Sequence, residues 1–312
     1  MSPASSTPAV SVILATRDRP ELLRQAVSSV LAQDFDGSIE IIAVYDQTAP
    51  DASLATDLET SHGADRSIRV IENSRTPGLP GARNSGMAVA QGSWIAFCDD
   101  DDSWRPSKLS RQLGLMERMG LRASVTGICV HYGDELRERH VGHDRLNTAD
   151  LVRSRVTAAH PSGYLAQRAM LLDGDVFVDE AIPGGYGEDY DWLLRVSELS
   201  DIAVAPEPLV DVLWHPGSFF TRRWETIIDA LEYLLDKHPV LRVDRRGHAR
   251  ILGQQAFALA ATGRRRESLR KVGKTLWSSP RERRAYATLP VLCHIVSAER
   301  ILHLANRVGR GI

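Results

Sequence analysis

Apolar residues along the first hundred positions of the chain follow two different spacings. Continuous apolar runs at residues 10–15, 39–45 and 94–98, with a weaker run at 68–72, predict buried strands. Residues 20–33 place apolar side chains three or four positions apart, and residues 81–90 do so over a shorter length, so both segments are predicted to be helices. Strands that alternate with helices form parallel sheets with right-handed crossovers, so we expect an α/β fold with a mostly parallel sheet.

The pattern changes after the first hundred residues. A helix is expected from Pro106, a strand at 123–131, a helix at 190–199 and two strands at 202–205 and 209–213. Between them, residues 142–187 are rich in Gly and Asp and show no regular period. From residue 226 onward the pattern is helical, with breaks expected at Pro239, Pro280 and Pro290.

Charge divides the chain unevenly. Residues 242–312 carry 16 Lys and Arg against 4 Asp and Glu, although the whole chain has a net charge of -2. A basic amphipathic helical region suits an anionic membrane surface, and it equally suits a solvated helical face. No recognised nucleic-acid-binding fold or interleaved aromatic pattern accompanies the charge, so nucleic acid is not expected as a partner.

The cysteines and the apolar segments indicate the cellular compartment in which the protein is expected. The three cysteines are widely spaced, which argues against a disulfide framework and a thiolate zinc site and suits a reducing cytoplasm. The N-terminus lacks the pattern of a signal peptide, and no run reaches the ~18 to 20 apolar residues that a membrane span requires. We expect a cytoplasmic protein, either free or peripheral at the inner face of the plasma membrane.

Four consecutive carboxylates, at Asp99, Asp100, Asp101 and Asp102, follow directly on the strand predicted at 94–98. Acidic runs are commonly solvated loops. This run, however, lies between a buried strand and a helix, at a strand end where open α/β sheets bind ligands. Mg²⁺ and Mn²⁺ prefer hard oxygen ligands, so the run predicts a divalent-cation site that faces the phosphates of a nucleotide.

Several separated segments together resemble the family 2 glycosyltransferases. They are residues 10–16 with Arg19-Pro20, residues 40–46, residues 81–86, residues 97–106, residues 187–195 and residues 215–218. The resemblance covers residues 9–220. It implies an inverting, metal-dependent enzyme of GT-A fold that moves a hexosyl or related unit from a UDP-, dTDP- or GDP-sugar to an acceptor hydroxyl. The acceptor would be a glycan, a lipid-linked molecule or a small molecule, in the synthesis of cell-surface polysaccharide or glycoconjugate.

The resemblance also implies roles on the donor side. Asp46 corresponds to the carboxylate that binds the nucleotide base, Thr16 and Arg17 are its neighbours, and Arg83 lies beside the base or the phosphates. Asp99 and Asp101 form the DxD motif that holds Mn²⁺ or Mg²⁺. Asp101 is expected to contact the metal, and Asp99 or Asp100 is expected to bind the ribose hydroxyls. Outside the motif, His215 is expected to lie near the metal and the diphosphate.

On the acceptor side, Asp189 is the expected catalytic base. By spacing alone, an acid at the start of a helix is better explained as a cap that complements the helix dipole, and only the family match favours catalysis. Glu188 is expected to bind the acceptor. Trp104 is expected to pack under the acidic loop, with acceptor contact as its alternative.

The resemblance suggests a division of the chain. Residues 1–224 would form the GT-A catalytic domain, with 1–131 for the nucleotide sugar and 132–224 for the acceptor, and residues 225–312 a basic helical C-terminal region. Two other functions remain as alternatives. A nucleotidyltransferase would need a glycine-rich first turn, which residues 16–20 lack. A non-catalytic binding protein on the same fold would be favoured if Asp101 or Asp189 were missing, and both are present.

Overall fold

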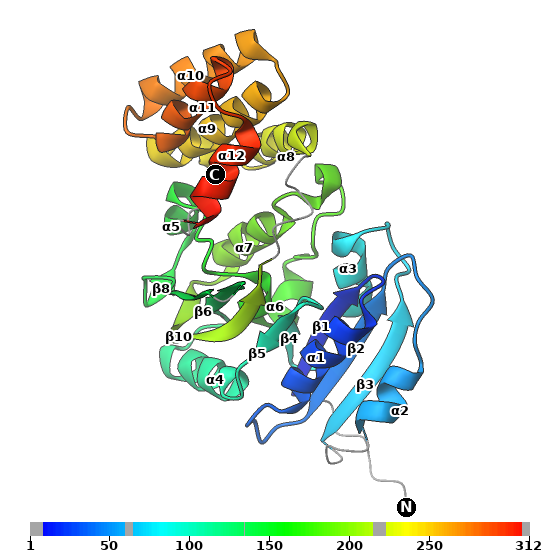
Figure 1. The fold of residues 1–312 in the computed structure, drawn as a ribbon. Helices are drawn as coiled ribbons and strands as arrows, with labels where there is room; N and C mark the ends of the chain where they lie inside the picture. Colours follow the sequence, from blue (N-terminus) through cyan, green and yellow to red (C-terminus); the bar gives the residue numbers. More distant parts are fainter. Residues whose placement is uncertain (1–8, 60–64, 134, 215–222, 308–312) are drawn as a thin grey trace, which may run out of the picture. The chain divides into compact units, whose positions relative to one another are not determined.

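Strands and helices alternate through the first hundred residues, as the apolar pattern predicts (Figure 1). The computed structural model describes residues 9–59, 65–133, 135–214 and 223–307. The first elements are β1 (Val10–Thr16), α1 (Pro20–Leu31), β2 (Ile39–Tyr45), α2 (Ser53–Glu59), β3 (Arg66–Glu72), α3 (Leu79–Val89) and β4 (Trp94–Phe97). The pattern does not predict α2, because seven residues are too few to establish a helical repeat.

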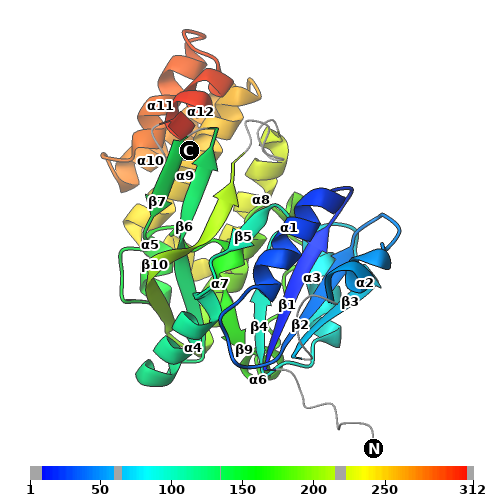
Figure 2. The ribbon, with the colours of Figure 1, turned by 60° about the horizontal axis from the view of Figure 1, so that its bottom comes forward.

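Helices cover both faces of the parallel part of the sheet (Figures 1 and 2). β3, β2, β1 and β4 are neighbours in that order, and all three pairs are parallel. Val12 and Leu14 share a core with the inner face of α1. On the other face α3 approaches closely, since a Cβ at Gly86 would lie 2.5 Å from Ile13 and 3.2 Å from Val44. Burial on both faces explains why β1, β2 and β4 are apolar at nearly every position, whereas β3 at the edge of the sheet is not.

The second half of the chain makes the sheet mixed. Its strands are β5 (Asp102–Trp104), β6 (Ala123–Tyr132), β7 (Glu135–Arg139), β8 (Arg145–Leu146), β9 (Leu165–Gln167) and β10 (Ile202–Leu213). β9 pairs antiparallel with both β4 and β6, and therefore joins the two halves of one sheet. β6 and β10 are parallel, whereas β5, β7 and β8 pair antiparallel with these two strands.

Several predicted boundaries in this half differ from the structure. Residues 202–213 form one strand rather than two, and its register against β6 shifts around Pro208 instead of breaking. The stretch 142–187 contains short elements that are too brief to show a period. They are α5 (Thr148–Arg153), η1 (Pro161–Gly163), α6 (Arg168–Asp173) and η2 (Pro183–Gly185). The helices α4 (Lys108–Met119) and α7 (Glu188–Leu199) lie close to their predicted positions.

Two compact units make up the chain. The first comprises residues 1–148, 156–180 and 188–215 and contains the sheet, and the second comprises residues 149–155, 181–187 and 216–312. The second unit contains α8 (Trp224–Lys237), η3 (Pro239–Arg242), α9 (Arg245–Ala261), α10 (Arg265–Ser278), α11 (Arg283–Leu292) and α12 (Ala298–Arg307). α9 is buried along nearly its whole length, because α8, α10 and α11 all pack against it.

One predicted helix break in the second unit is wrong. α11 continues through Pro290, whereas Pro239 and Pro280 lie between helices as expected. Pro290 falls in the last turn, so it removes one hydrogen bond near the helix end, and the backbone beyond it still bonds through Cys293 N to Leu289 O and His294 N to Val291 O. Among the described residues, no helix has the length and apolar content needed to cross a membrane.

Candidate functional site

Three neighbouring parallel strands end at the same edge of the sheet and bring the predicted donor residues together. Thr16 is the last residue of β1, Asp46 follows β2, and Asp99 follows Cys98 just after β4. β1 lies between β2 and β4, so the chain leaves β1 on one side for β2 and returns on the other as β4. Such a point at the carboxyl ends of the strands is where open α/β sheets bind ligands.

The middle of the acidic run turns toward the loop after β1. The Thr16 hydroxyl donates to Asp100 Oδ2 at 2.7 Å, and Arg19 Nη1 lies 3.1 Å from Asp100 Oδ1 and 2.8 Å from Asp101 Oδ2. Burial raises the pKa of Asp100 to about 6, although the Thr16 hydroxyl and Arg19 favour its charged form. Burial and then the charge of Asp99 raise the pKa of Asp101. Arg19 is therefore the counter-charge of these two acids.

The end of the acidic run turns inward. Asp102 accepts a hydrogen bond from the Ser162 hydroxyl, and its Oδ2 lies 3.3 Å from His160 Nδ1. Ser162 Oγ in turn accepts from the backbone N–H of Asp99 at 2.9 Å. The Asp102 side chain is only 1% exposed, and burial together with the Asp99 charge raises its pKa well above the usual range. Burial also lowers the pKa of His160, against the influence of Asp99.

Arg83 links the acidic run to the first turn of α7. Its Nη2 lies 2.6 Å from Asp99 Oδ1, its Nη1 lies 2.5 Å from Glu188 Oε1, and its guanidinium stands over the Phe97 ring at 5.3 Å. Burial alone would lower the pKa of this 3% exposed side chain, but the two carboxylates outweigh burial and raise it. One buried cation thus neutralises acids from two segments that are far apart in the sequence.

Asp189 lies beside this bridge. It is the second residue of α7, it is partly exposed, and its charge acts on both Arg83 and His160. Glu188 is 7% exposed and paired with Arg83, so Asp189 is the more accessible of the two acids. A carboxylate that is close to a buried cation and still reachable from solvent is suited to accept a proton from a bound hydroxyl group.

Asp46 forms a second, smaller centre at the same edge. Its carboxylate accepts from Asn73 Nδ2 at 2.8 Å, from Gln47 Nε2 at 2.8 Å, and from the backbone N–H of Gly78 at 3.0 and 3.1 Å. Burial opposes the charged form, but these hydrogen bonds, with the nearby charge of Arg17, lower the pKa of Asp46. The group therefore stays ionised and presents fixed acceptor oxygens.

The described residues offer one group at this edge with the donor set for a divalent cation. One ligand atom from each of Asp99, Asp102 and His160 lies within 4.8 Å of the others. The two carboxylates suit Mn²⁺ or Mg²⁺, whereas an imidazole is the more usual ligand of softer ions such as Zn²⁺. Elsewhere in the sheet, Cys129, His131 and Asp211 are equally close together, but Arg105 already pairs with Asp211 at 3.4 Å and neutralises it.

Comparison with known protein families decides the class. The family model described as glycosyl transferase family 2 matches residues 11–173, which is more than half of the chain. The chain belongs to glycosyl transferase family 2. The matched segment contains the ends of β1, β2 and β4 and the whole acidic run.

Two relatives are named for succinoglycan biosynthesis and for glucosyl transfer. The chain is 30% identical over 220 residues to the succinoglycan biosynthesis protein ExoO of Rhizobium meliloti, covering 67% of this chain and 61% of that protein. It is 34% identical over 109 residues to the UDP-Glc:alpha-D-GlcNAc-diphosphoundecaprenol beta-1,3-glucosyltransferase WfaP of Escherichia coli, covering 35% of this chain and 41% of that protein. The chain thus spans less than two thirds of the length of these relatives.

Solved structures share the fold across nearly the whole chain. S. aureus TarS 1-349 in complex with UDP-GlcNAc superposes with a TM-score of 0.62 at 14% identity, covering 97% of this chain and 92% of that one. The mannosyltransferase PcManGT from Pyrobaculum calidifontis, in complex with GDP-Man and Mn²⁺, gives a TM-score of 0.56 at 15% identity, covering 97% and 89%. At this identity the likeness shows the fold alone, and it confirms the predicted GT-A fold with its helical C-terminal region.

The predicted site residues are distributed unequally over the structure. Thr16, Arg83, Asp99, Asp100, Asp101, Glu188 and Asp189 belong to one connected group, and Asp46 to the neighbouring one. Arg17 is exposed, and Trp104 is 4% exposed within the core, with its ring 3.7 Å from Lys108 Nζ. His215 lies outside the described residues.

Sequence reasoning missed Arg19, Asn73, Gly78, His160 and Ser162 as members of these groups. The Arg19-Pro20 motif gives Arg19 no role of its own, and the other four residues fall in segments without a helical or strand period. An Asn directly after a strand, as at Asn73, was the one usable signal, because residues at this position face the ligand edge of a parallel sheet.

Proposed function

We propose that this protein is an inverting, metal-dependent glycosyltransferase that moves a hexosyl or related unit from a UDP-, dTDP- or GDP-sugar to an acceptor hydroxyl. One observation carries the proposal. Arg83 connects Asp99, in the acidic run, to the turn that begins with Glu188 and Asp189. Groups that can neutralise a leaving diphosphate and a group that can accept a proton therefore belong to one ordered cluster.

On the donor side, Asp46 would accept hydrogen bonds from the base. Three protein groups already donate hydrogen bonds to this carboxylate. Of these, the side chain of Gln47 is exposed, so it is the donor that an N–H of the base would replace. Thr16 and Arg17 would lie beside the base, and Arg83 with Asp99 and Asp100 would order the ribose and phosphate side.

For the transfer itself, Asp189 would accept the proton of the acceptor hydroxyl while that oxygen bonds to the anomeric carbon and the bond to the diphosphate breaks. General-base help of this kind contributes about 10² to 10⁴ in rate. Glu188 would contact the acceptor while its Oε1 stays paired with Arg83 at 2.5 Å, because a carboxylate accepts through two oxygens.

Mn²⁺ or Mg²⁺ would be held by the acidic run. Asp99 and Asp101, with His215, are the ligands implied by the family pattern, whereas Asp99, Asp102 and His160 are the group with close ligand atoms. Such a cation supplies a positive charge that stabilises the departing diphosphate. We favour Asp101 over Asp102, because Asp101 is 24% exposed and Asp102 is only 1% exposed.

Donor hydrolysis and nucleotide binding test the catalytic assignment together. Asp189→Asn should remove turnover while thermal stabilisation by the preferred nucleoside diphosphate with Mn²⁺ remains. A ligand at 100 times its dissociation constant stabilises the fold by about 2.7 kcal/mol, so screening UDP, GDP and dTDP would also identify the base. Near-normal turnover in Asp189→Asn would show that Asp189 is not the base. A wild-type protein that binds nucleotide without turnover would favour the non-catalytic alternative.

Manganese binding separates the two possible ligand sets. Mn²⁺ titration followed by electron paramagnetic resonance should show lost binding for Asp99→Asn and Asp101→Asn and retained binding for His160→Ala. Asp101→Ala should also abolish metal-dependent hydrolysis and transfer. Retained binding in Asp101→Asn with loss in His160→Ala would instead assign the ion to Asp99, Asp102 and His160.

The acceptor and the location are a further part of the proposal. We infer that residues 1–131 serve the donor and 132–224 the acceptor, and that the protein works in the cytoplasm at the inner face of the plasma membrane. A related glucosyltransferase is named for a diphosphoundecaprenol-linked substrate, which supports a lipid-linked glycan acceptor in surface polysaccharide synthesis.

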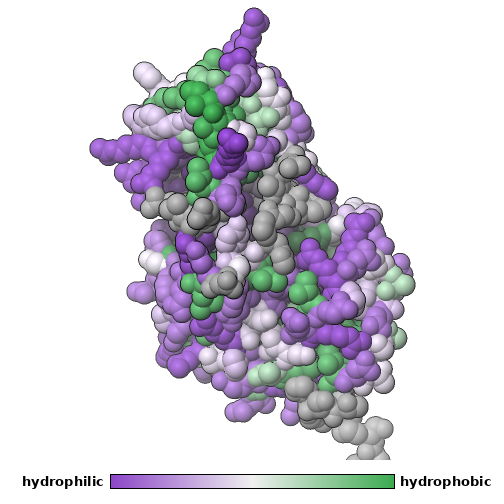
Figure 3. Space-filling model, viewed as in Figure 1, coloured by the Kyte–Doolittle hydropathy of each residue, from purple (hydrophilic) through white to green (hydrophobic). Residues whose placement is uncertain are grey.

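The C-terminal helices support the membrane contact. In Figure 3 hydrophobic residues gather in a strip over these helices, among hydrophilic side chains. The exposed large apolar residues in the described part of this region are Val240, Val243, Leu269, Trp277, Tyr286, Leu289, Ile295 and Leu304. Basic and apolar side chains together favour an anionic lipid surface.

A further inference from the structure

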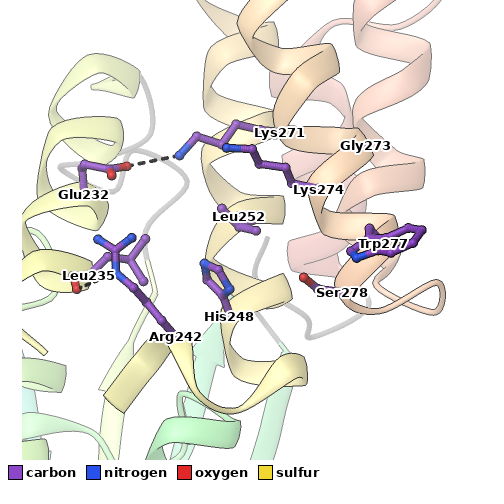
Figure 4. A pocket seen from close by; sticks show the side chains of 10 residues that line it. All are labelled: Glu232, Leu235, Arg242, His248, Leu252, Lys271, Gly273, Lys274, Trp277 and Ser278. Carbon is purple, nitrogen blue, oxygen red and sulfur yellow. Dashed lines mark hydrogen bonds and ion pairs between the residues drawn. The ribbon is translucent and has the colours of Figure 1, made fainter. Parts of the chain in front are cut away.

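A pocket of 420 Å³ opens in the helical unit, away from any residue assigned above (Figure 4). α8 contributes Glu232, η3 contributes Arg242, α9 contributes His248, and α10 contributes Lys271 and Lys274. In Figure 4 the two lysines extend from α10 toward α8, and Arg242 points into the same space from the other side. Four basic side chains thus converge from three elements.

Acidic neighbours neutralise only part of this charge. Lys271 Nζ lies 3.2 Å from Glu232 Oε2 and donates to Gln255 Oε1 at 2.7 Å. Arg242 pairs with Asp236, whose side chain is 71% exposed and does not line the pocket, and its Nε donates to Leu235 O at 3.2 Å. Lys274 is exposed and has no ion-pair partner among the described residues. The pocket therefore keeps a positive excess that its own carboxylate does not cancel.

The charges around His248 show the same excess of positive charge. Burial lowers the pKa of His248, and the charges of Arg242, Lys271 and Lys274 lower it further, against Glu232 alone. His248 is thus neutral at neutral pH, and its ring can donate one hydrogen bond without adding charge. A site with Lys and Arg cations around a neutral donor suits a phosphate group, which accepts several hydrogen bonds at once.

We propose that this pocket binds the phosphate group of an anionic ligand, held by Arg242, Lys271 and Lys274. Trp277 indicates where that phosphate comes from. Its side chain lines the pocket on α10 together with the two lysines, and it is 84% exposed. An exposed indole next to basic side chains is typical of protein segments at a membrane surface. A phospholipid headgroup is therefore the favoured source, and a soluble phosphate compound the other. Only the choice of a lipid source rests on the membrane contact proposed above, and the phosphate site itself does not depend on the transferase activity.

Vesicle flotation of the full-length chain tests the site. We expect binding to phosphatidylcholine vesicles that contain phosphatidylglycerol and little binding to phosphatidylcholine alone. Lys274→Gln should weaken this binding about fivefold, the usual share of one basic residue near an anionic surface. Arg266→Gln is the matched control, because Arg266 is exposed on the same helix and does not line the pocket. Equal losses in both variants would overturn the pocket in favour of a diffuse basic surface.

Soluble phosphate separates the two sources. At constant ionic strength, inorganic phosphate should raise the melting temperature of the wild type and of Arg266→Gln but not of Lys274→Gln. Phosphate stabilisation without vesicle binding would keep the site and assign it a soluble ligand, and vesicle binding without phosphate stabilisation would assign it to lipid. Absence of both effects would refute the proposal.

Donor hydrolysis, measured on the same samples, distinguishes failure of the phosphate site from failure of the proposed transferase function. Lys274→Gln should hydrolyse the nucleotide sugar like the wild type in the absence of vesicles. If the wild type binds anionic vesicles through the pocket but never hydrolyses donor, the transferase proposal fails and the phosphate site stands. If hydrolysis is normal and the variants bind vesicles like the wild type, the phosphate site fails alone.

Discussion

Replacing Arg83 with methionine should lower the free energy of unfolding of this protein by about 3 kcal/mol. Arg83 is 3% exposed and pairs with Asp99 at 2.6 Å and with Glu188 at 2.5 Å. Methionine fills a similar volume without charge, so it leaves two carboxylates facing each other with no counter-charge. Removing one partner of a buried ion pair costs about 3 to 5 kcal/mol, and the lower figure applies because Asp99 is 23% exposed.

Burial, and not the ion-pair distance, sets this magnitude. Arg137 lies 2.6 Å from Glu135, the same separation as Arg83 from Asp99, but the two side chains are 43% and 61% exposed. Exposed pairs contribute about 0.2 to 1 kcal/mol, so Arg137→Met should cost at most about 1 kcal/mol. Urea denaturation at neutral pH, followed by tryptophan fluorescence, measures both variants in the same way.

A double-mutant cycle isolates the interaction itself. Glu188→Gln alone leaves the Arg83 cation short of a partner, and the combination with Arg83→Met removes both charges. The two single losses should therefore exceed the double loss by about 2 kcal/mol. A loss below about 1 kcal/mol for Arg83→Met, or additivity within about 0.5 kcal/mol, would refute the argument that this buried cation joins the acidic run to α7.

Three further changes test other parts of the structure. Burial lowers the pKa of Lys108 to about 7, so Lys108→Met should stabilise the fold at neutral pH by about 3 kcal/mol after allowance for the lost contact with Trp104. Above pH ~7 the unfolding of the wild type takes up a proton on Lys108, so the stability of the wild type should rise with pH above this value. In urea titrations the greater stability of Lys108→Met should therefore disappear by about pH 10.5. Gly81→Ala should lower the free energy of unfolding by about 1 to 3 kcal/mol, since a Cβ there would lie 1.9 Å from the backbone oxygen of Thr76. Gly114→Ala in α4 should instead raise it by about 0.5 to 1 kcal/mol, because alanine favours the helix. Equal melting temperatures for the two variants would contradict this. Asp46→Asn should weaken nucleoside diphosphate binding about tenfold or more in calorimetry, and unchanged affinity would remove Asp46 from the base site.

Much of the first unit could be predicted from the sequence. β1, β2 and β4 are continuous apolar runs because helices cover both faces of the sheet, and α1 shows the three-to-four spacing of a helix with one buried face. Both signals are local, since each depends on neighbours within a few positions. The position of the acidic run directly after β4 was equally visible, and with it the edge of the sheet at which a ligand site should lie.

Only the tertiary structure decided how the charges of that site are compensated. Asp102 begins β5, a three-residue strand that exists because Asp102 pairs with Val212 of β10, and its buried carboxylate meets Ser162 from η1. Arg83 likewise joins acids that are 16 and 105 positions away in the sequence. The sequence determined the elements and the acidic run, because a helical or apolar period is written in adjacent residues. The partners of each buried charge depended on which distant segments pack together, because desolvation requires every such charge to find its counter-charge within the folded chain.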